Sequence, residues 1–224
     1  MSIKDWPESE RPRERLLARG AGTLTEADLL AICLRTGLPG RSALELARAA
    51  LDRFGSLRGL LSAHHEELTA LPGFGPAKAA QLIAVLELAR RTLKEDVRDG
   101  DVLATPAKVR EYLRLYFVGR QDEAFVALYL DAQNRLLEVE ELFRGTLTQT
   151  SVYPRVVVRA ALRRNAGAVI FAHNHPSGVA EPSRADERLT HSLKDALALV
   201  EVRVVDHIIV TGGSTLSFVE RGLL

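Results

Sequence analysis

A buried strand that ends in two histidines, followed closely by a helix start, is the feature that most constrains this chain. Residues 166–172, AGAVIFA, are small, apolar and partly β-branched, which predicts a buried strand. His173 and His175 stand at its end, and Pro176 begins a turn. Because side chains alternate along a strand, both rings are expected on the same face. The sequence therefore brings two imidazoles together where a strand meets a loop.

A carboxylate is predicted to join these two rings. Ser183 and Asp186 open a segment whose apolar residues recur at helical spacing, so Asp186 falls in the first turn and faces the strand end. Two imidazoles and one carboxylate suit a zinc ion with a fourth position left for water. The S-x-x-D pattern is also a capping box, which satisfies backbone N–H groups. The two interpretations are compatible, and we predict metal binding by His173, His175 and Asp186.

The same residues resemble a known motif. H-x-H-P followed by S-x-x-D is the motif of the JAMM (MPN-plus) metal-dependent hydrolases. The longer string GTLTQTSVYPRVVVRAALRRNAGAVIFAHNHPSGVAEPSRAD and the segment DHIIV at Asp206–Val210 are similar to bacterial RadC-type (UPF0758) proteins. The resemblance covers the chain from about residue 102 to its end and extends into the N-terminal third. Tyr153 departs from the pattern, since RadC-type chains usually have His before the Pro-Arg pair.

The resemblance implies an activity and roles for two further residues. One zinc ion per chain, held by the two histidines and Asp186, would serve the hydrolysis of an amide or isopeptide bond in an unidentified protein or peptide. Ser183 would donate a hydrogen bond to the oxyanion. Glu123, which opens the strand pattern AFVALYL, is our candidate for the general base that shuttles a proton. The alternatives flank the next strand pattern and are Glu138, Glu140 and Glu141.

Other functions are less well supported by the sequence. Nucleobase deaminases need H-x-E and a P-C-x-x-C pair, but the chain has a single cysteine, Cys33, which is expected to pack as a small apolar group. The zincin motif H-E-x-x-H is also absent from the sequence. A nuclease usually needs several carboxylate ligands, whereas the motif offers one clear ligand carboxylate, Asp186. The main alternative is a non-enzymatic DNA repair or recombination accessory protein with a structural or vestigial metal site.

The N-terminal third is predicted to be helical and to contain a helix-hairpin-helix at about residues 65–92. Gly73 and Gly75 permit a tight turn and let a phosphate approach backbone N–H groups, and Lys78 would add a charge there. Such contacts hold a DNA backbone without selecting sequence. Phe74 is expected to be a core residue. A plain helical hairpin that packs within the chain is the alternative.

Charge and composition limit the partners. The net charge is only +1, and neither half has the basic excess typical of a strong nucleic-acid binder, so any DNA contact should be weak. No run approaches the roughly 18 apolar residues that span a bilayer, so no membrane contact is predicted. The start, MSIKDWPESERPRER, lacks an apolar signal region. With one cysteine, a cytoplasmic location is predicted.

The predicted organisation is a helical region over residues 1–100 and an α/β domain over residues 102–224. The resemblance implies that the second is an MPN/JAMM domain, a curved mixed sheet flanked by helices. Its helices are predicted at 106–117, 154–165 and 184–199, and its strands at 124–130, 136–142, 168–173, 202–210 and 214–219. His207 is predicted to be buried, with support of the metal site as the alternative. The remaining histidines, His64, His65 and His191, are expected to be solvated.

Overall fold

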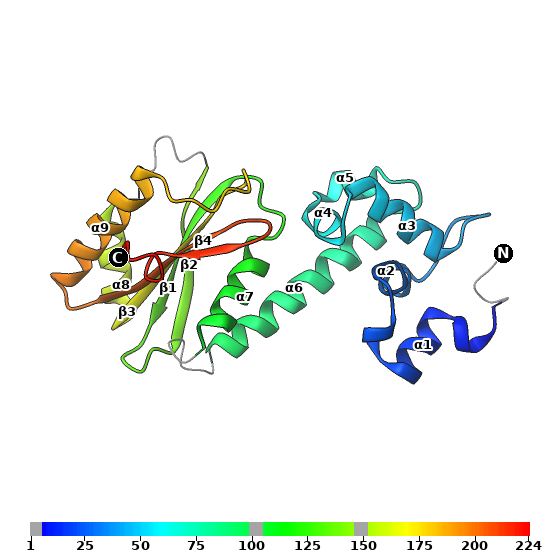
Figure 1. Cartoon of the computed structure of the whole chain (residues 1–224), viewed down its shortest axis with the longest axis horizontal. Helices are drawn as coiled ribbons and strands as arrows, with labels where there is room; N and C mark the ends of the chain where they lie inside the picture. Colours follow the sequence, from blue (N-terminus) through cyan, green and yellow to red (C-terminus); the bar gives the residue numbers. More distant parts are fainter. Residues whose placement is uncertain (1–5, 99–104, 146–151) are drawn as a thin grey trace. The chain divides into compact units, whose positions relative to one another are not determined.

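The computed structural model describes residues 6–98, 105–145 and 152–224. Two compact units divide the chain, Met1–Leu88 and Ala89–Leu224, and each has its own apolar core (Figure 1). The boundary predicted near residue 100 lies outside the described residues. Within the described ranges, every helix is too short or too polar to cross a bilayer.

The first unit is helical, as predicted. Thr25 and Ser42 each begin a helix with a capping box, because their side chains accept the N–H of the third helical residue. Phe74 is fully buried in the core of this unit, which confirms its predicted role. The helices are α1 (Pro12–Arg19), α2 (Glu26–Leu34), α3 (Ala43–Phe54), α4 (Leu57–Ser62), α5 (His65–Thr69) and the beginning of α6 (Pro76–Arg98), with short 3-10 turns at η2 (Glu8–Glu10) and η3 (Ala21–Thr23).

The hairpin between α5 and α6 requires a glycine. Gly73 has a φ of 87°, in the left-handed region that L side chains rarely adopt. A Cβ at this position would also come within 2.7 Å of Cγ of Leu38. The tight turn predicted from the sequence is therefore a packing requirement within the helical unit.

The second unit is built on a five-stranded mixed sheet in the order β2-β1-β3-β4-β5. The β1 strand pairs antiparallel with both β2 and β3, β3 pairs parallel with β4, and β4 pairs antiparallel with β5. The mixed sheet with flanking helices confirms the predicted fold class. The strands are β1 (Glu123–Leu130), β2 (Leu136–Gly145), β3 (Ala168–Asn174), β4 (Arg203–Val210) and β5 (Thr215–Ser217).

Helices cover both faces of this sheet (Figure 1). The end of α6 and α7 (Pro106–Tyr116) pack on one face, and α8 (Pro154–Arg163) and α9 (Arg184–Ala198) pack on the other. Side chains alternate along β1 and contribute to the cores on both faces of the sheet. Val126 and Leu128 face α7, whereas Phe125 and Ala127 face α8 and α9. We call the second of these the α8/α9 face.

A register shift in the sheet decides which face some polar residues take. Between β3 and β4, Val169 pairs with Val204 but Ile170 pairs with Asp206, so one extra residue is inserted in β4. Phe171 therefore pairs with His207, which lies on the α8/α9 face. The shift places an imidazole beside the end of β3.

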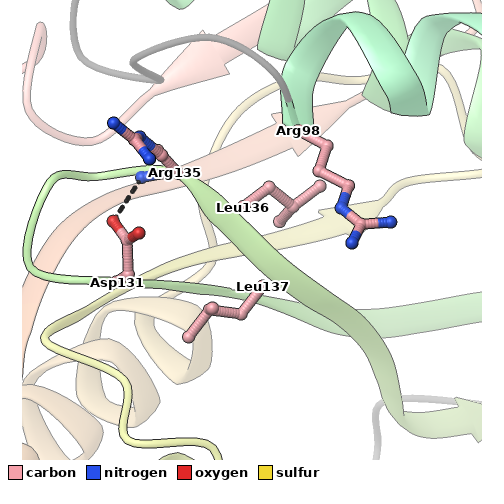
Figure 2. A pocket seen from close by; sticks show the side chains of 5 residues that line it. All are labelled: Arg98, Asp131, Arg135, Leu136 and Leu137. Carbon is pink, nitrogen blue, oxygen red and sulfur yellow. Dashed lines mark hydrogen bonds between the residues drawn. The ribbon is translucent and has the colours of Figure 1, made fainter.

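The turn between β1 and β2 lies at the opposite end of the sheet from the histidines. Leu130, beside this turn, pairs with Ala168 at the start of β3. Asp131 closes the turn, since its Oδ1 accepts the N–H groups of Gln133 and Arg135, both at 2.8 Å. The pocket beside it is thus distant from the predicted metal ligands along the strand. Its lining residues are Arg98, Asp131, Arg135, Leu136 and Leu137 (Figure 2).

Candidate metal centre

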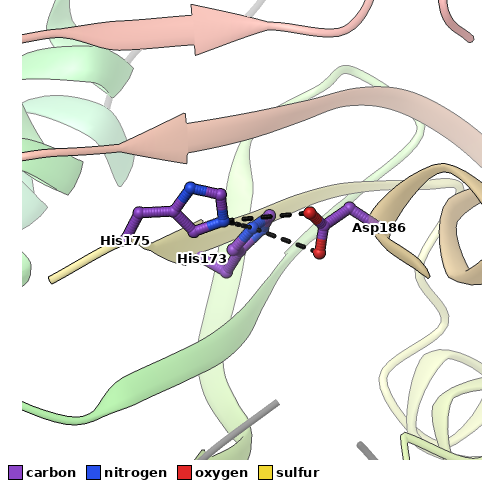
Figure 3. Close-up of side chains that lie close together, drawn as sticks. All are labelled: His173, His175 and Asp186. Atoms are coloured by element: carbon purple, nitrogen blue, oxygen red, sulfur yellow. Dashed lines mark hydrogen bonds and ion pairs between the residues drawn. The ribbon is translucent and has the colours of Figure 1, made fainter. Parts of the chain in front are cut away.

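The β3 strand brings the two histidine rings together. All seven of its residues are buried, and His173 near its end is inaccessible to solvent. His175 follows one residue beyond the strand, and its N–H donates to the carbonyl of Val210, which extends the pairing with β4. The two Nε2 atoms are 2.9 Å apart (Figure 3). The alternation expected from the sequence thus makes both rings converge.

Asp186 reaches the rings from the first turn of α9. The capping box predicted at this position is present: Oδ2 of Asp186 accepts the N–H of Ser183 at 2.7 Å and its hydroxyl at 2.6 Å. The carboxylate also faces both histidines, with Oδ1 3.5 Å from Nε2 of His173 and Oδ2 3.8 Å from Nε2 of His175 (Figure 3). Asp186 is 5% exposed, so water screens this arrangement poorly.

Hydrogen bonding and burial together favour a metal ion between the rings. Nδ1 of His175 lies 2.8 Å from the carbonyl oxygen of Val179, an acceptor, so Nδ1 carries the proton and Nε2 of the neutral ring presents a lone pair. Two lone pairs on ring nitrogens 2.9 Å apart repel each other, and a cation between them would remove that repulsion. Burial lowers the pKa of His173 to about 4, and His175 adds to this although Asp186 opposes it. Protonation is therefore disfavoured at neutral pH.

The donor set fits one divalent ion. Zinc–nitrogen and zinc–oxygen bonds are about 2.0–2.2 Å long, so two donors on one ion lie at most about 4 Å apart. The separations of 2.9, 3.5 and 3.8 Å among the ring nitrogens and the carboxylate oxygens all meet this limit. Among the residues that the structure describes, His173, His175 and Asp186 are the group identified as able to hold a metal ion.

Asn174, between the two histidines, was not among the predicted site residues. Its Oδ1 accepts the N–H of Ala124 at 2.8 Å, and its Nδ2 donates to the carbonyl of Asp122 at 3.0 Å. Asn174 is 4% exposed, and both bonds lie just beyond the last β1–β3 pair, Phe125 with His173. Asn174 therefore ties both neighbours of Glu123 to the end of β3. The sequence offered one signal for it, a buried-strand position within H-N-H.

Glu123 starts β1 on the same face of the sheet as the histidines. Phe125, two residues later, pairs with His173 and stacks on its ring with centroids 6.0 Å apart. Since side chains two residues apart share a face, Glu123 lies on the α8/α9 face. Continuing the antiparallel register by two residues places Glu123 opposite His175. Glu123 as a residue is half-buried.

The three alternative glutamates lie elsewhere on β2. Glu138 pairs with Tyr129, farther along the sheet, and accepts a hydrogen bond from Nε of Arg164 at 2.6 Å. Glu140 lies 3.2 Å from the same guanidinium. Glu141 forms an ion pair with Arg120. Each carboxylate thus has an arginine partner, and the β1 register places all three farther from His173 than Glu123.

The predicted DNA-contact residues lie in the helical unit. Nζ of Lys78 donates to the carbonyl of Thr36 at 2.6 Å and to that of Gly73 at 2.9 Å. Gly75 accepts the N–H groups of Lys78 and Ala79 through its carbonyl, which starts α6. Desolvation lowers the pKa of Lys78. Lys78 therefore contacts two backbone carbonyls within the helical unit.

Known proteins are similar to this chain over its full length. The family model of the RadC-like JAB domain matches residues 103–223, and that of the UPF0758 N-terminal region matches residues 3–80. Relatives named UPF0758 protein are 60% identical in Nitrosomonas eutropha and in Nitrosospira multiformis, and 62% identical in Dechloromonas aromatica. Each alignment covers 100% of both chains. These names state no activity.

Proposed function

Because this chain belongs to the RadC-like JAB-domain family, we propose that it is a zinc-dependent hydrolase of amide or isopeptide bonds. The observation that carries the proposal is the convergence of His173, His175 and Asp186 within bonding reach of one ion. Two neutral nitrogens and one carboxylate leave the fourth position of a tetrahedral zinc ion open, which distinguishes catalytic from structural sites. A bound zinc ion would supply Lewis acidity, polarising a carbonyl and making water a stronger acid.

The chain's own residues would handle the proton. Glu123 would accept a proton from the attacking water, whose oxygen forms a bond to the carbonyl carbon. As the carbon–nitrogen bond breaks, the same carboxyl would return that proton to the leaving amine. Asn174 supports this assignment, because it holds the backbone on both sides of Glu123. One water molecule is consumed, and the products are a carboxylic acid and an amine, which exist as carboxylate and ammonium at neutral pH.

Ser183 is proposed to stabilise charge that develops on the carbonyl oxygen. Its hydroxyl donates to Asp186 at 2.6 Å, so it would have to turn toward the substrate during the reaction. Removal of one such donor typically lowers kcat by a factor of about 100 to 1,000. Ser183→Ala is therefore expected to reduce kcat by about that factor when it is assayed at a zinc concentration that saturates the variant.

Replacement of Glu123 tests the assignment of the general base. Glu123→Gln should retain one zinc per chain by elemental analysis and lose about 100- to 10,000-fold in the hydrolysis of a fluorogenic peptide or isopeptide library. Glu141→Gln is the matched control, because that carboxylate faces α7 and pairs with Arg120. Equal activity of Glu123→Gln and the wild type would remove Glu123 from the mechanism. A zinc-loaded wild type inactive on every substrate class would favour the accessory-protein alternative.

The helical unit is proposed to add a weak, sequence-independent contact to DNA backbones at Gly73 and Gly75. The hairpin shape supports this idea, but Lys78 is engaged with two carbonyls and the net charge is only +1. Fluorescence anisotropy with short duplexes at low salt tests the contact. Lack of binding under those conditions would overturn the DNA proposal and leave the hydrolase proposal unaffected.

A further inference from the structure

We propose that His207 and Thr190 are positioning residues that fix the tautomer and orientation of the metal-site ring of His173. The inference rests on the proposed function only in treating His173 as a metal ligand. Both are inaccessible to solvent, with His207 on β4 and Thr190 on α9.

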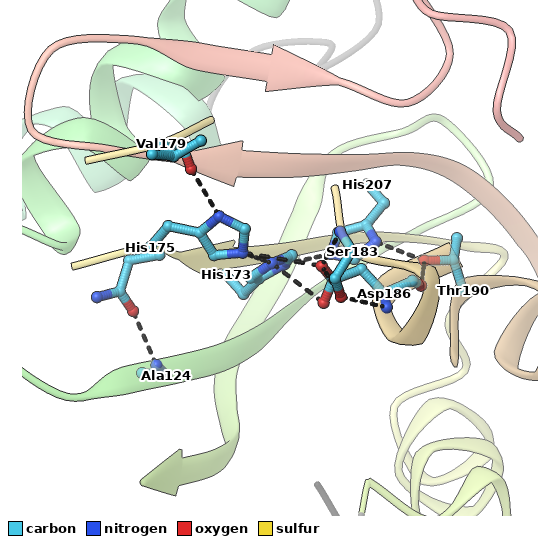
Figure 4. A network of polar contacts seen from close by, with 9 residues as sticks. Ala124, His173, His175, Val179, Ser183, Asp186, Thr190 and His207 are labelled. Atoms are coloured by element: carbon cyan, nitrogen blue, oxygen red, sulfur yellow. Dashed lines mark hydrogen bonds and ion pairs between the residues drawn. The ribbon is translucent and has the colours of Figure 1, made fainter. Parts of the chain in front are cut away.

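A chain of three short hydrogen bonds connects two of the metal ligands (Figure 4). Nδ1 of His173 lies 2.7 Å from Nε2 of His207. Nδ1 of His207 lies 2.6 Å from the hydroxyl of Thr190, and this hydroxyl lies 2.6 Å from the backbone carbonyl oxygen of Asp186. The path thus starts at one ligand, passes through two residues with no other assigned role, and ends at another ligand.

The donor and acceptor of each hydrogen bond in this chain follow from the group at its end, the carbonyl oxygen of Asp186. The carbonyl oxygen of Asp186 can only accept, so the Thr190 hydroxyl donates to it and has a lone pair left for Nδ1–H of His207. Neutral His207 then presents a lone pair at Nε2, which accepts Nδ1–H of His173. His173 must therefore carry its proton on Nδ1 and present a lone pair at Nε2 to the metal. That is the tautomer a metal ligand needs.

Aromatic packing keeps the His207 ring in place. Its centroid lies 4.5 Å from that of Phe218, 5.2 Å from Phe125 and 6.3 Å from Phe171. The ring is completely buried in this setting. An apolar residue could fill the same space, but Nδ1 of His173 would then be left without this acceptor. Filling the core thus accounts for burial at position 207 but not for an imidazole.

Substitution of Thr190 separates this role from simple packing. Thr190→Val keeps the side-chain volume and removes the hydroxyl, whereas Thr190→Ser keeps the hydroxyl. In Thr190→Val, His207 is expected to move its proton to Nε2 and donate to His173, which would put a proton on the metal-facing nitrogen. Replacing a residue that hydrogen-bonds to a metal ligand typically lowers metal affinity by about 10- to 100-fold. We therefore expect zinc affinity to fall by that factor in Thr190→Val and to stay near wild type in Thr190→Ser.

The tautomers are read directly in the metal-free full-length chain by nitrogen-15 NMR of the imidazole rings at neutral pH. We expect Nδ1–H for His173 in the wild type and Thr190→Ser, and Nε2–H in Thr190→Val. Cobalt(II) spectra of the loaded proteins should differ between Thr190→Val and Thr190→Ser. His191→Asn is the control, because this exposed ring of α9 bonds only its own helix backbone, at Glu187, in the contacts observed.

Defined outcomes would overturn the proposal. An Nε2–H tautomer of His173 in the wild type would contradict it before any substitution is made. Unchanged zinc affinity and tautomer in folded Thr190→Val would also contradict it. If Thr190→Val does not fold, His207→Gln replaces it, since its amide oxygen can still accept from His173 and should retain affinity that His207→Leu loses. If these tautomers and zinc affinities are found but no hydrolysis is detected, the proposed function is refuted and the positioning role of His207 and Thr190 is retained.

Discussion

Two buried capping boxes in this protein share the same local structure but differ in what faces the carboxylate. Asp28 in α2 and Asp186 in α9 are each the third residue of a helix, and they are 6% and 5% exposed. Asp28 accepts from Thr25, and Asp186 accepts from Ser183, through both a backbone N–H and a hydroxyl. Asp28 has the guanidinium of Arg15 at 3.4 Å, whereas Asp186 faces two imidazoles.

The difference shows where a cation is needed. A buried carboxylate is costly unless an opposite charge accompanies it. The helical unit supplies that charge from its own sequence, because Arg15 pairs with Asp28. Beside Asp186, burial lowers the pKa of His173, so that ring stays neutral and does not supply the positive charge that Arg15 supplies at Asp28. The capping motif is thus common to both places, and the group that faces the carboxylate, an arginine at Asp28 and two imidazoles at Asp186, distinguishes them.

Removing each carboxylate charge is the strongest way to test this comparison. In Asp186→Asn the amide oxygen can still cap α9, but the carboxylate of the three-residue ligand set is lost, so we expect stoichiometric zinc binding to disappear. The affinity loss should exceed the roughly 100-fold that outer partners alone can cause. Elemental analysis and competition with a chelating dye measure it.

Asp28→Asn provides the matched control in the helical unit. It removes the partner of Arg15 and should lower stability without changing the zinc content per chain. Full zinc binding by Asp186→Asn would contradict the ligand assignment. An equal loss of zinc in both variants would show that unfolding, and not ligand removal, was measured.

Acidification of the metal-free protein should lower the stability of the second unit more than that of the helical unit. The pKa of His173 is about 4 in the folded chain and near 6.5 when unfolded, so the unfolded state binds more protons as the pH falls. Stability of the second unit should therefore decrease from about pH 6.5 to about pH 4, by about 3 kcal/mol from His173. The histidines of the helical unit, His64 and His65, are exposed.

Chemical denaturation of chelator-treated protein at several pH values tests this expectation. His173→Asn should flatten the pH dependence of the second unit, and His191→Asn should leave it unchanged. A stability of the second unit that is constant between pH 6.5 and 4 would show that the buried rings do not resist protonation.

Local patterns in the sequence were sufficient to predict much of the site. The apolar run before His173 predicted β3, alternation predicted that His173 and His175 share a face, and S-x-x-D predicted the start of α9. Each of these features depends on residues close together in the chain. The sequence could also identify Asp186 as a cap, but not whether an arginine or two imidazoles would face it.

Features set by strand register could not be predicted. The inserted residue between β3 and β4 places His207 on the face of His173, and without it His207 would face α7. Similar shifts between β1 and β2 determine which way Glu138, Glu140 and Glu141 point. The two bonds of Asn174 likewise join segments about 50 residues apart. Periodicity within one strand carries no information on such pairings.

The smallest expected effect is the loss of stability when the cap side chain of α9 or of α2 is removed. Ser183→Ala and Thr25→Ala each remove a side chain that accepts the N–H of the third helical residue, at 3.1 and 3.2 Å. Loss of such a cap costs about 1 kcal/mol, so both variants of chelator-treated protein should lose similar free energies of unfolding in their own unit. Only Ser183→Ala should also change zinc affinity, because its hydroxyl orients the ligand carboxylate. A much larger stability loss for Ser183→Ala would mean that the α9 cap stabilises the metal-free protein more than the α2 cap does. The two capping boxes would then differ in more than the group that faces each carboxylate.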